Sequence, residues 1–169
     1  PKRMFDLGMT FLSATERRFD AEAIVDGEVR FTYGQWFQCI SQVAGGLLEI
    51  GLRSGDHFVF VLKNRWQSAT LHWACQLIGV IATPLNWRSK AEEINFVLCD
   101  ADAKVVAFEP STSVAVYEAV ASYRAICLGV NINSDVNFED LSKSRPADKI
   151  GGVKPDDISV MLYTSGTTG

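Results

Sequence analysis

The residues with the clearest chemical potential form the last loop of the sequence, directly after the apolar run 158–162. Two glycines let the backbone adopt geometries closed to other residues, so that consecutive N–H groups can turn inward. Four Ser and Thr hydroxyls add hydrogen-bond donors around the same hollow. Such a hollow suits a polyphosphate. The loop consists of Thr164, Ser165, Gly166, Thr167, Thr168 and Gly169.

This loop differs from the two common nucleotide-binding fingerprints. A Walker loop ends in Gly-Lys followed by Ser or Thr, and a dinucleotide loop has three glycines at fixed spacing where a helix opens. Neither pattern is present. Taken alone, a short stretch rich in Ser, Thr and Gly is more often a solvated turn. Its position after a run typical of a buried strand, together with the motifs described below, favours phosphate binding instead.

A second candidate, Arg88, follows a predicted strand at 80–85. Its permanently charged, planar guanidinium suits a phosphate group, and its loop would lie on the carboxyl-end side of the predicted sheet. The alternative is a solvated arginine or a local ion pair with Glu92 or Glu93. The neighbouring Trp87 could stack on a base, although packing is the more common use of tryptophan.

Other reactive residue types show no pattern of a metal or redox site. The four cysteines lie far apart, without a Cys-x-x-Cys pair and among apolar neighbours, which predicts buried free thiols. His57 and His72 have no metal-ligand spacing. Asp156 and Asp157 follow a proline and precede an apolar run, so we expect them to punctuate a turn. No metal ligand is assigned.

Length and composition limit the function classes. The 169 residues are 47% hydrophobic and 11% aromatic, which is ample for a core. Sixteen basic against 20 acidic residues give a net charge of −4 without a large basic cluster, so nucleic acid is not an expected partner. No apolar run reaches the length of a membrane span, and the N-terminus lacks a signal-peptide pattern. We expect a soluble, cytoplasmic protein.

Apolar runs of strand type alternate with segments of helical periodicity along the chain. This alternation predicts an α/β fold with a mainly parallel sheet flanked by helices. In such sheets ligands gather beyond the carboxyl ends of the strands, where the terminal loop falls. The predicted strands are 58–62, 80–85, 104–108, 125–128 and 158–162.

Local signals predict how several elements begin. Asp26-Gly27 between two short β-prone runs predicts a hairpin. Thr32–Gln35 and Ser89–Glu92 have the pattern of capping boxes, and Asn64 is the predicted cap of the helix between them. Gly45-Gly46 weakens the helix that follows the first box, which indicates close approach of a neighbouring element.

Four blocks, in order, give the chain a resemblance to the adenylate-forming (AMP-binding) superfamily, which includes acyl-CoA synthetases, peptide-synthetase adenylation domains and firefly-type luciferases. Phe31-Thr32-Tyr33 resembles the opening element of that family, and residues 79–86 (Gly-Val-Ile-Ala-Thr-Pro-Leu-Asn) resemble its second block. Residues 90–106 resemble the block that comes next in the family. Residues 155–169 resemble the strand and phosphate loop of the AMP-binding signature, and this block is the most specific. The likeness spans roughly residues 10–169.

The resemblance implies the activation of a small-molecule carboxylate. Family enzymes join a carboxylate to ATP, release pyrophosphate, and pass the acyl group from the acyl-adenylate to a thiol; ATP, Mg²⁺ and CoA are the implied cofactors and co-substrates. By motif, the residues of the 164–169 loop would hold the β- and γ-phosphates as binders rather than as acids or bases. Arg88 matches a position that could contact the nucleotide end of CoA. No residue is assigned a catalytic role.

The resemblance also predicts the domain organisation. Residues 1–169 would be the N-terminal portion of the AMP-binding domain, its first subdomain, with the rest of that domain and the C-terminal domain absent. The family's phosphate loop continues into Pro-Lys-Gly beyond Gly169. We therefore expect the 169-residue chain alone to be inactive in adenylation.

Two other functions remain open. An adenylation module would load a carrier-protein thiol instead of CoA. Pro84-Leu85-Asn86 and Thr167-Thr168 resemble free-standing CoA ligases more than such modules. A non-enzymatic α/β interaction module is the alternative from a different class, because burial and capping explain the segments before residue 158 without a ligand.

Overall fold

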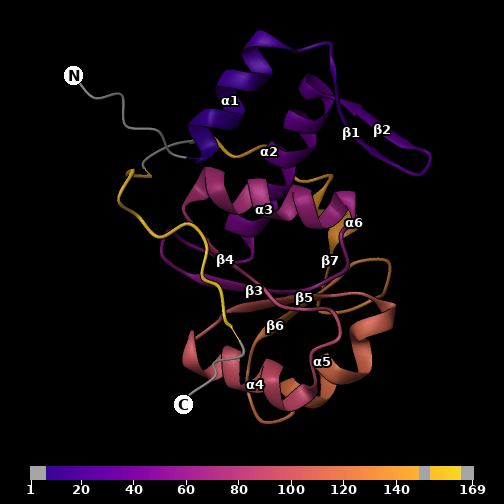
Figure 1. The fold of residues 1–169 in the computed structure, drawn as a ribbon, viewed down its shortest axis with the longest axis vertical. Helices are drawn as coiled ribbons and strands as arrows, with labels where there is room; N and C mark the ends of the chain where they lie inside the picture. The colour runs from indigo at the N-terminus through magenta and orange to yellow at the C-terminus, as the bar shows by residue number, and fades with distance from the viewer. Residues whose placement is uncertain (1–6, 149–152, 165–169) are drawn as a thin grey trace.

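A five-stranded parallel sheet lies at the centre of the molecule, with helices on both faces (Figure 1). The computed structural model describes residues 7–148 and 153–164. The strand order is β4-β3-β5-β6-β7, so the α/β fold with a mainly parallel sheet is confirmed. The strands are β3 (His57–Val61), β4 (Ile81–Pro84), β5 (Val105–Phe108), β6 (Ile126–Gly129) and β7 (Val136–Asn137).

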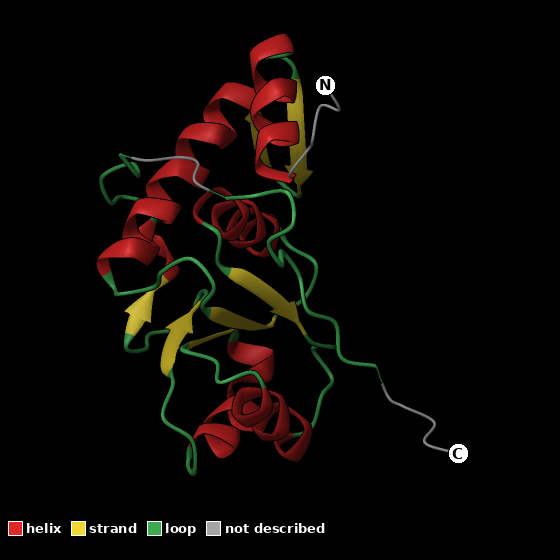
Figure 2. Ribbon diagram, turned by 90° about the vertical axis from the view of Figure 1, so that its left-hand side faces the viewer, coloured by secondary structure: helices red, strands yellow, loops and turns green. Residues whose placement is uncertain are grey.

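The helices form two layers, one on each side of this sheet, as Figure 2 shows. On one side lie α1 (Leu7–Arg17), α2 (Tyr33–Glu49), α3 (Trp66–Ile78) and the short α6 (Phe138–Leu141). On the other lie α4 (Ala91–Asp100) and α5 (Ser113–Val120), the latter preceded by a 3₁₀ turn, Pro110–Thr112.

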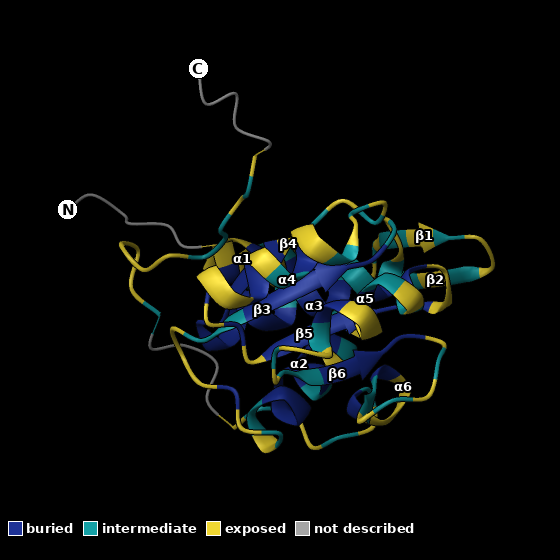
Figure 3. Cartoon of the chain, turned by 90° about the horizontal axis from the view of Figure 1, so that it is seen from below, coloured by how far each residue is buried: buried dark blue, intermediate teal, exposed yellow. Residues whose placement is uncertain are grey.

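The strands separate two hydrophobic clusters, and Figure 3 shows that the buried residues follow the sheet and the helix faces against it. Along β3, Phe58 and Phe60 belong to the cluster under α2 and α3, whereas Val59 and Val61 belong to the cluster over α4 and α5. Each fully buried side chain of this kind contributes about 1.5–3 kcal/mol. Burial on both faces explains why this strand reads as a continuous apolar run.

An antiparallel hairpin, β1 (Glu22–Asp26) and β2 (Val29–Thr32), precedes the sheet, as predicted. Gly27 adopts φ +59° in its turn. The hairpin also caps α3, because the Asp26 carboxylate accepts a hydrogen bond of 3.0 Å from the Trp66 backbone N–H. The prediction of Asn64 as the cap was wrong, because Arg65 occupies the N-cap position. The free backbone N–H at the start of the helix is satisfied by a carboxylate 40 residues away in the sequence.

The two structural predictions for α2 are confirmed. Thr32 Oγ1 accepts from the Gln35 N–H at 3.2 Å, and Gln35 Oε1 accepts from the Thr32 N–H at 3.0 Å, which completes the capping box. At Gly45 a Cβ atom would overlap the carbonyl oxygen of Arg145, and at Gly46 it would crowd Leu141. Glycine is therefore required where the 141–147 segment crosses this helix.

Four other elements differ from expectation. The capping box of α4 lies one residue later than predicted, because the Lys90 N–H donates to Glu93 at 2.8 Å. The predicted strand 158–162 is reduced to one parallel bridge between Val160 and Ala82, and its ends are exposed rather than buried. Helix α1 was not among the predicted elements, and the two-residue strand β7 is too short to leave a periodic pattern.

The cysteines are free thiols, but only some of them are buried as predicted. Cys75 and Cys127 are buried, Cys39 is half-buried, and Cys99 is exposed on α4. Burial raises the pKa of the Cys39 thiol to about 11 and raises that of Cys75 further. No helix in the described part of the chain is both long and apolar enough to cross a membrane.

Candidate functional site

The loops that follow β3, β4 and β5 leave the sheet at one edge. β3 pairs in parallel with both neighbours, so Phe60 lies beside Pro84 and Val61 lies beside Phe108 where the strands end. Parallel pairing thus brings together residues 62–65, 85–90 and 109–112. This carboxyl edge is where α/β sheets place their ligands.

An open hollow of about 890 Å³ lies at this edge. It is bounded by the loop after β4, by α4 and by the last described residues of the chain. Its lining combines apolar, charged and hydroxyl-bearing side chains. The lining residues are Pro84, Leu85, Asn86, Arg88, Ser89, Glu92, Glu93, Phe96, Val97, Tyr163 and Thr164.

Two of the predicted binding residues line this hollow. Thr164 is exposed and lines it together with Arg88, which comes from the loop after β4. The rest of the predicted phosphate loop, Ser165, Gly166, Thr167, Thr168 and Gly169, lies outside the described residues. The first residue of the loop and Arg88 therefore line the same hollow.

The loop after β4 holds Arg88 away from the nearby carboxylates. Asn86 Oδ1 accepts the Arg88 backbone N–H at 2.9 Å, which tightens the turn. No ion pair within 4.0 Å joins the guanidinium to Glu92 or Glu93, and Glu93 accepts from Lys90 instead. The alternative of a local ion pair is thus not realised among the described residues.

Two cationic side chains contact the indole ring of Trp87. The Arg88 guanidinium carbon lies 4.3 Å from the ring centre and Lys63 Nζ lies 4.6 Å from it, both as cation–π contacts. Lys63 comes from the loop after β3 and was not a predicted site residue. No local sequence pattern marks it, because its contact crosses from one loop to the next.

Glu109 is the buried carboxylate of this edge, with only 1% of its surface exposed. Its Oε2 accepts the Lys63 backbone N–H at 3.1 Å, and its Oε1 accepts the Ser111 hydroxyl at 2.9 Å. Arg65 Nη2 lies 3.6 Å from the same carboxylate. Glu109 thus fixes the loop after β3, and with it the start of the Lys63 side chain.

Tyr163 is the last side-chain anchor before Thr164. Its hydroxyl donates to Asp100 Oδ2 at 2.6 Å, and its ring contacts Phe96 edge to face at 6.3 Å. Burial raises the pKa of Tyr163 to about 12, and the hydrogen bond to Asp100 and its negative charge act in the same direction. The tyrosine is therefore protonated, and a donor, throughout the neutral range.

The segment before Tyr163 is held along the edge of β4. The Ser159 carbonyl accepts from the Ala82 N–H at 3.1 Å and from Gln76 Nε2 at 3.2 Å, and the Met161 N–H donates to the Ala82 carbonyl at 3.0 Å. These contacts direct the chain toward the carboxyl edge.

Across residues 7–148 and 153–164, no group of three or more His, Cys, Asp or Glu side chains is placed to hold a metal ion. Lys63, Arg88 and Thr164 are side chains of the carboxyl edge that can donate hydrogen bonds to an anion.

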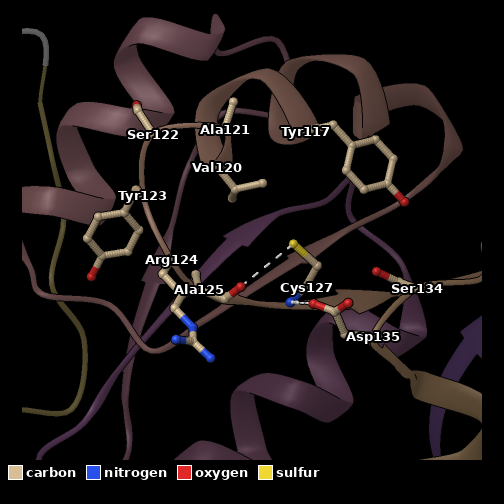
Figure 4. Close-up of a pocket in the computed structure, with 10 residues that line it drawn as sticks. All are labelled: Tyr117, Val120, Ala121, Ser122, Tyr123, Arg124, Ala125, Cys127, Ser134 and Asp135. Carbon is tan, nitrogen blue, oxygen red and sulfur yellow. Dashed lines mark hydrogen bonds between the residues drawn. The ribbon is translucent and has the colours of Figure 1, made fainter.

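A second hollow, of about 650 Å³, lies at the amino edge of the sheet (Figure 4). Two of its polar groups, Asp135 and Tyr123, are used by the fold itself. Asp135 accepts the Cys127 backbone N–H at 3.0 Å, and the Tyr123 hydroxyl donates to the Ala103 carbonyl at 2.8 Å. This hollow shares no lining residue with the one at the carboxyl edge.

The comparisons with known proteins agree with this architecture. The profile of the family described as "AMP-binding enzyme" matches residues 11–169. The long-chain-fatty-acid–CoA ligase FadD13 of Mycobacterium tuberculosis (strain ATCC 25618 / H37Rv) is 31% identical over 147 residues, covering 84% of this chain and 28% of FadD13. A feruloyl-CoA synthase of Amycolatopsis sp is 29% identical over 149 residues, covering 88% of this chain and 28% of that synthase.

The fold is also found in solved structures. A benzoate CoA ligase from Burkholderia xenovorans LB400 superposes with a TM-score of 0.88 and 20% identity, over 94% of this chain and 32% of that protein. At this identity the likeness establishes the fold alone. The family profile covers nearly the whole chain, and the chain therefore belongs to the AMP-binding enzyme family. It spans less than a third of the length of the two curated relatives named above.

Proposed function

We propose that the protein containing this chain is an ATP-dependent acid–thiol ligase of the acyl-CoA synthetase type. The observation that carries the proposal is that Arg88 and Thr164, the first residue of the hydroxyl-rich loop, line one hollow at the carboxyl edge of a parallel sheet. Membership of the AMP-binding enzyme family and the similarity to acyl-CoA ligases support it.

The proposed reaction has two steps. A carboxylate oxygen of the substrate attacks the α-phosphorus of ATP, and the bond to the pyrophosphate oxygen breaks. The sulfur of CoA then attacks the acyl carbonyl carbon, AMP leaves, and a thioester forms. Mg²⁺ bound to ATP would neutralise part of the phosphate charge in the first step.

The residues of this chain would act by binding and orienting. The N–H and hydroxyl groups of the 164–169 loop would hold the β- and γ-phosphates and stabilise the charge that develops on the departing pyrophosphate. Tyr163, through Asp100, would orient this loop, and Arg88 would contact a phosphate of a nucleotide ligand. Preorganised donors of this kind lower the barrier without a covalent step.

ATP–pyrophosphate exchange with a panel of aliphatic and aromatic carboxylates would test the proposal on the intact protein. We expect exchange with at least one carboxylate, followed by thioester formation when CoA is added. Because the chain spans less than a third of these relatives, we expect the 169-residue chain by itself to give no exchange. Exchange by the isolated chain would overturn that expectation.

A second candidate is an adenylation module that loads a carrier-protein thiol. The discriminating measurement offers the intact protein CoA and a carrier protein bearing a phosphopantetheine arm. Faster thioester formation on CoA supports the ligase, and transfer only to the carrier supports the module. A protein that binds no ATP and activates no carboxylate would instead be a non-enzymatic interaction module.

A further inference from the structure

We infer that Gln76 on α3 is a positioning residue, which fixes the register of the segment 158–163 through the Ser159 carbonyl. The register of this segment sets where Thr164, the first residue of the hydroxyl-rich loop, lies at the carboxyl edge. The hold on the segment follows from the contacts of the described residues. Its effect on turnover rests on the proposed function, because it assumes that the loop beginning at Thr164 binds ATP.

Burial does not hold this segment in place. No residue from 153 to 164 is buried, and the side chains of Ile158 and Leu162 are more than half exposed. Among the described residues, its pairing with the sheet is the single parallel bridge between Val160 and Ala82. So short a pairing specifies the register weakly, and a slip of one residue would turn every side chain of the segment to the opposite face.

The Gln76 amide adds a second contact beside this bridge. Its Nε2 donates to the Ser159 carbonyl at 3.2 Å, and the Ala82 N–H donates to the same carbonyl at 3.1 Å. One carbonyl thus accepts from α3 and from β4 at once. Because successive residues of an extended chain face opposite sides, a slip of one residue would break both hydrogen bonds.

The two donors belong to one rigid unit. Helix α3 ends at Gly79, which adopts φ +75°, and the Val80 N–H donates to the Cys75 carbonyl at 3.0 Å across the turn into β4. Gln76 and Ala82 therefore keep a constant spacing. A constant spacing is what a contact needs if it is to select one register of the segment.

The Gln76 amide is committed to this contact. Its side chain is only 5% exposed, and within residues 7–148 and 153–164 the Ser159 carbonyl is the hydrogen-bond partner of its amide. A buried amide is unfavourable unless it is hydrogen-bonded, so the loss of this contact would leave the Gln76 donor unsatisfied. The contact therefore favours the observed register over the alternatives.

The register at Ser159 decides what the end of the segment contacts. Tyr163 lies four residues further along, and its hydroxyl donates to Asp100 at 2.6 Å. Gln76 from α3 and Asp100 from α4 thus hold the segment from the two helix layers, which cover opposite faces of the sheet (Figure 1). Small displacements of groups that stabilise a departing pyrophosphate lower the rate strongly.

Hydrogen exchange of the intact protein tests the hold without requiring catalysis. Gln76→Met keeps the approximate volume of the side chain and removes its donor. We expect the Met161 amide, which donates to the Ala82 carbonyl, to exchange roughly tenfold faster in this variant. Peptides covering β3 and β5 should exchange as in the wild type. Gln76→Lys keeps a donor on a side chain of similar length and should retain most of the protection.

ATP–pyrophosphate exchange tests the consequence for the reaction. Gln76→Met should lower kcat/KM for ATP about tenfold, because the donors for the phosphates are displaced. The KM for the carboxylate should not change, and Gln76→Lys should restore most of the activity. Faster hydrogen exchange at Met161 with an unchanged kcat/KM would overturn the positioning role, and so would unchanged hydrogen exchange at Met161.

Gln67→Met is the matched control. Gln67 lies on the same helix and is 7% exposed, but its Oε1 has no hydrogen-bond partner. This variant also replaces a buried amide with a thioether, so it reports the general effect of such a change in α3. It should leave the hydrogen exchange of Met161 and kcat/KM for ATP as in the wild type. Equal effects of Gln67→Met and Gln76→Met would overturn the inference.

The proposed function can fail separately. A wild-type protein that shows no pyrophosphate exchange would refute the ligase, whereas faster hydrogen exchange at Met161 in Gln76→Met would still support the hold on the segment. Equal pyrophosphate exchange by the wild type and Gln76→Met would retain the ligase and refute the positioning role.

Discussion

The two edges of the central sheet use their charged residues differently. At the amino edge, Lys104 and Asp56 form an ion pair of 2.8 Å, and Asp135 accepts a backbone N–H. At the carboxyl edge, Lys63 and Arg88 lie over one indole ring without a carboxylate partner among the described residues. Asp56, Lys104 and Asp135 at the amino edge are thus engaged in contacts within the fold, whereas Lys63 and Arg88 at the carboxyl edge have no carboxylate partner among the described residues.

The buried carboxylate Glu109 is the exception at the carboxyl edge, and its removal should have the largest effect. Glu109→Ala leaves the Lys63 N–H and the Arg65 guanidinium without their acceptor. We expect a loss of about 2–4 kcal/mol in the free energy of unfolding, measured by urea titration of the protein. A loss below about 0.5 kcal/mol would show that this carboxylate does not fix the loop after β3.

Tyr163 and Tyr123 allow a matched test of the two edges. Both hydroxyls donate hydrogen bonds, Tyr163 to Asp100 beside the terminal loop and Tyr123 to the Ala103 carbonyl at the amino edge. Tyr163→Phe should raise the KM for ATP about fivefold in the intact protein, the equivalent of one hydrogen bond of about 1 kcal/mol. Tyr123→Phe should leave it unchanged. Equal effects of the two variants would remove the distinction between the edges.

The raised pKa of Tyr163 predicts that the stability of the folded protein depends on pH. In the unfolded chain a tyrosine has a pKa near 10, whereas Tyr163 in the folded protein has a pKa of about 12. Because the folded value is the higher one, the stabilisation is fully present below pH 10 and is lost as the pH rises toward 12 and beyond. Ultraviolet titration should show a late-ionising tyrosine that is missing in Tyr163→Phe; identical curves for wild type and variant would contradict this.

The smallest expected effect is at the amino edge. Asp56→Asn removes the ion pair with Lys104, which is more than half exposed, while the amide can still accept the Arg53 N–H. We expect a loss of about 0.2–1 kcal/mol, which added salt should reduce. The KM for ATP should not change. A raised KM would show that the amino edge influences the site at the carboxyl edge, against this prediction.

Much of the fold could be predicted because its signals are local. The strand predicted at 58–62 follows from a run of apolar residues and is observed at 57–61. The helix at 91–100 follows from apolar residues at helical spacing, and the capping box at Thr32 and Gln35 follows from a four-residue pattern. The cap of α3 could not be found in this way, because Asp26 lies 40 residues from the backbone N–H that it accepts. Tertiary contacts supplied what the local sequence did not.

The site was predictable in part for the same reason. Arg88 stands out beside a recognisable strand end, whereas Lys63 and Glu109 have meaning only once β3, β4 and β5 lie side by side. Their sequence neighbours do not distinguish a buried glutamate from a solvated one. The roles of residues 165–169 stay predictions, because these residues lie outside the described part.

Hydrogen exchange of the intact protein with and without Mg²⁺-ATP tests the central claim most directly, namely that ligand binding belongs to the carboxyl edge. We predict slower exchange in peptides covering 62–66, 85–90 and 158–169, with no change in those covering 120–136 at the amino edge. Protection confined to 120–136, or no protection at the carboxyl edge with ATP at saturating concentration, would contradict the account.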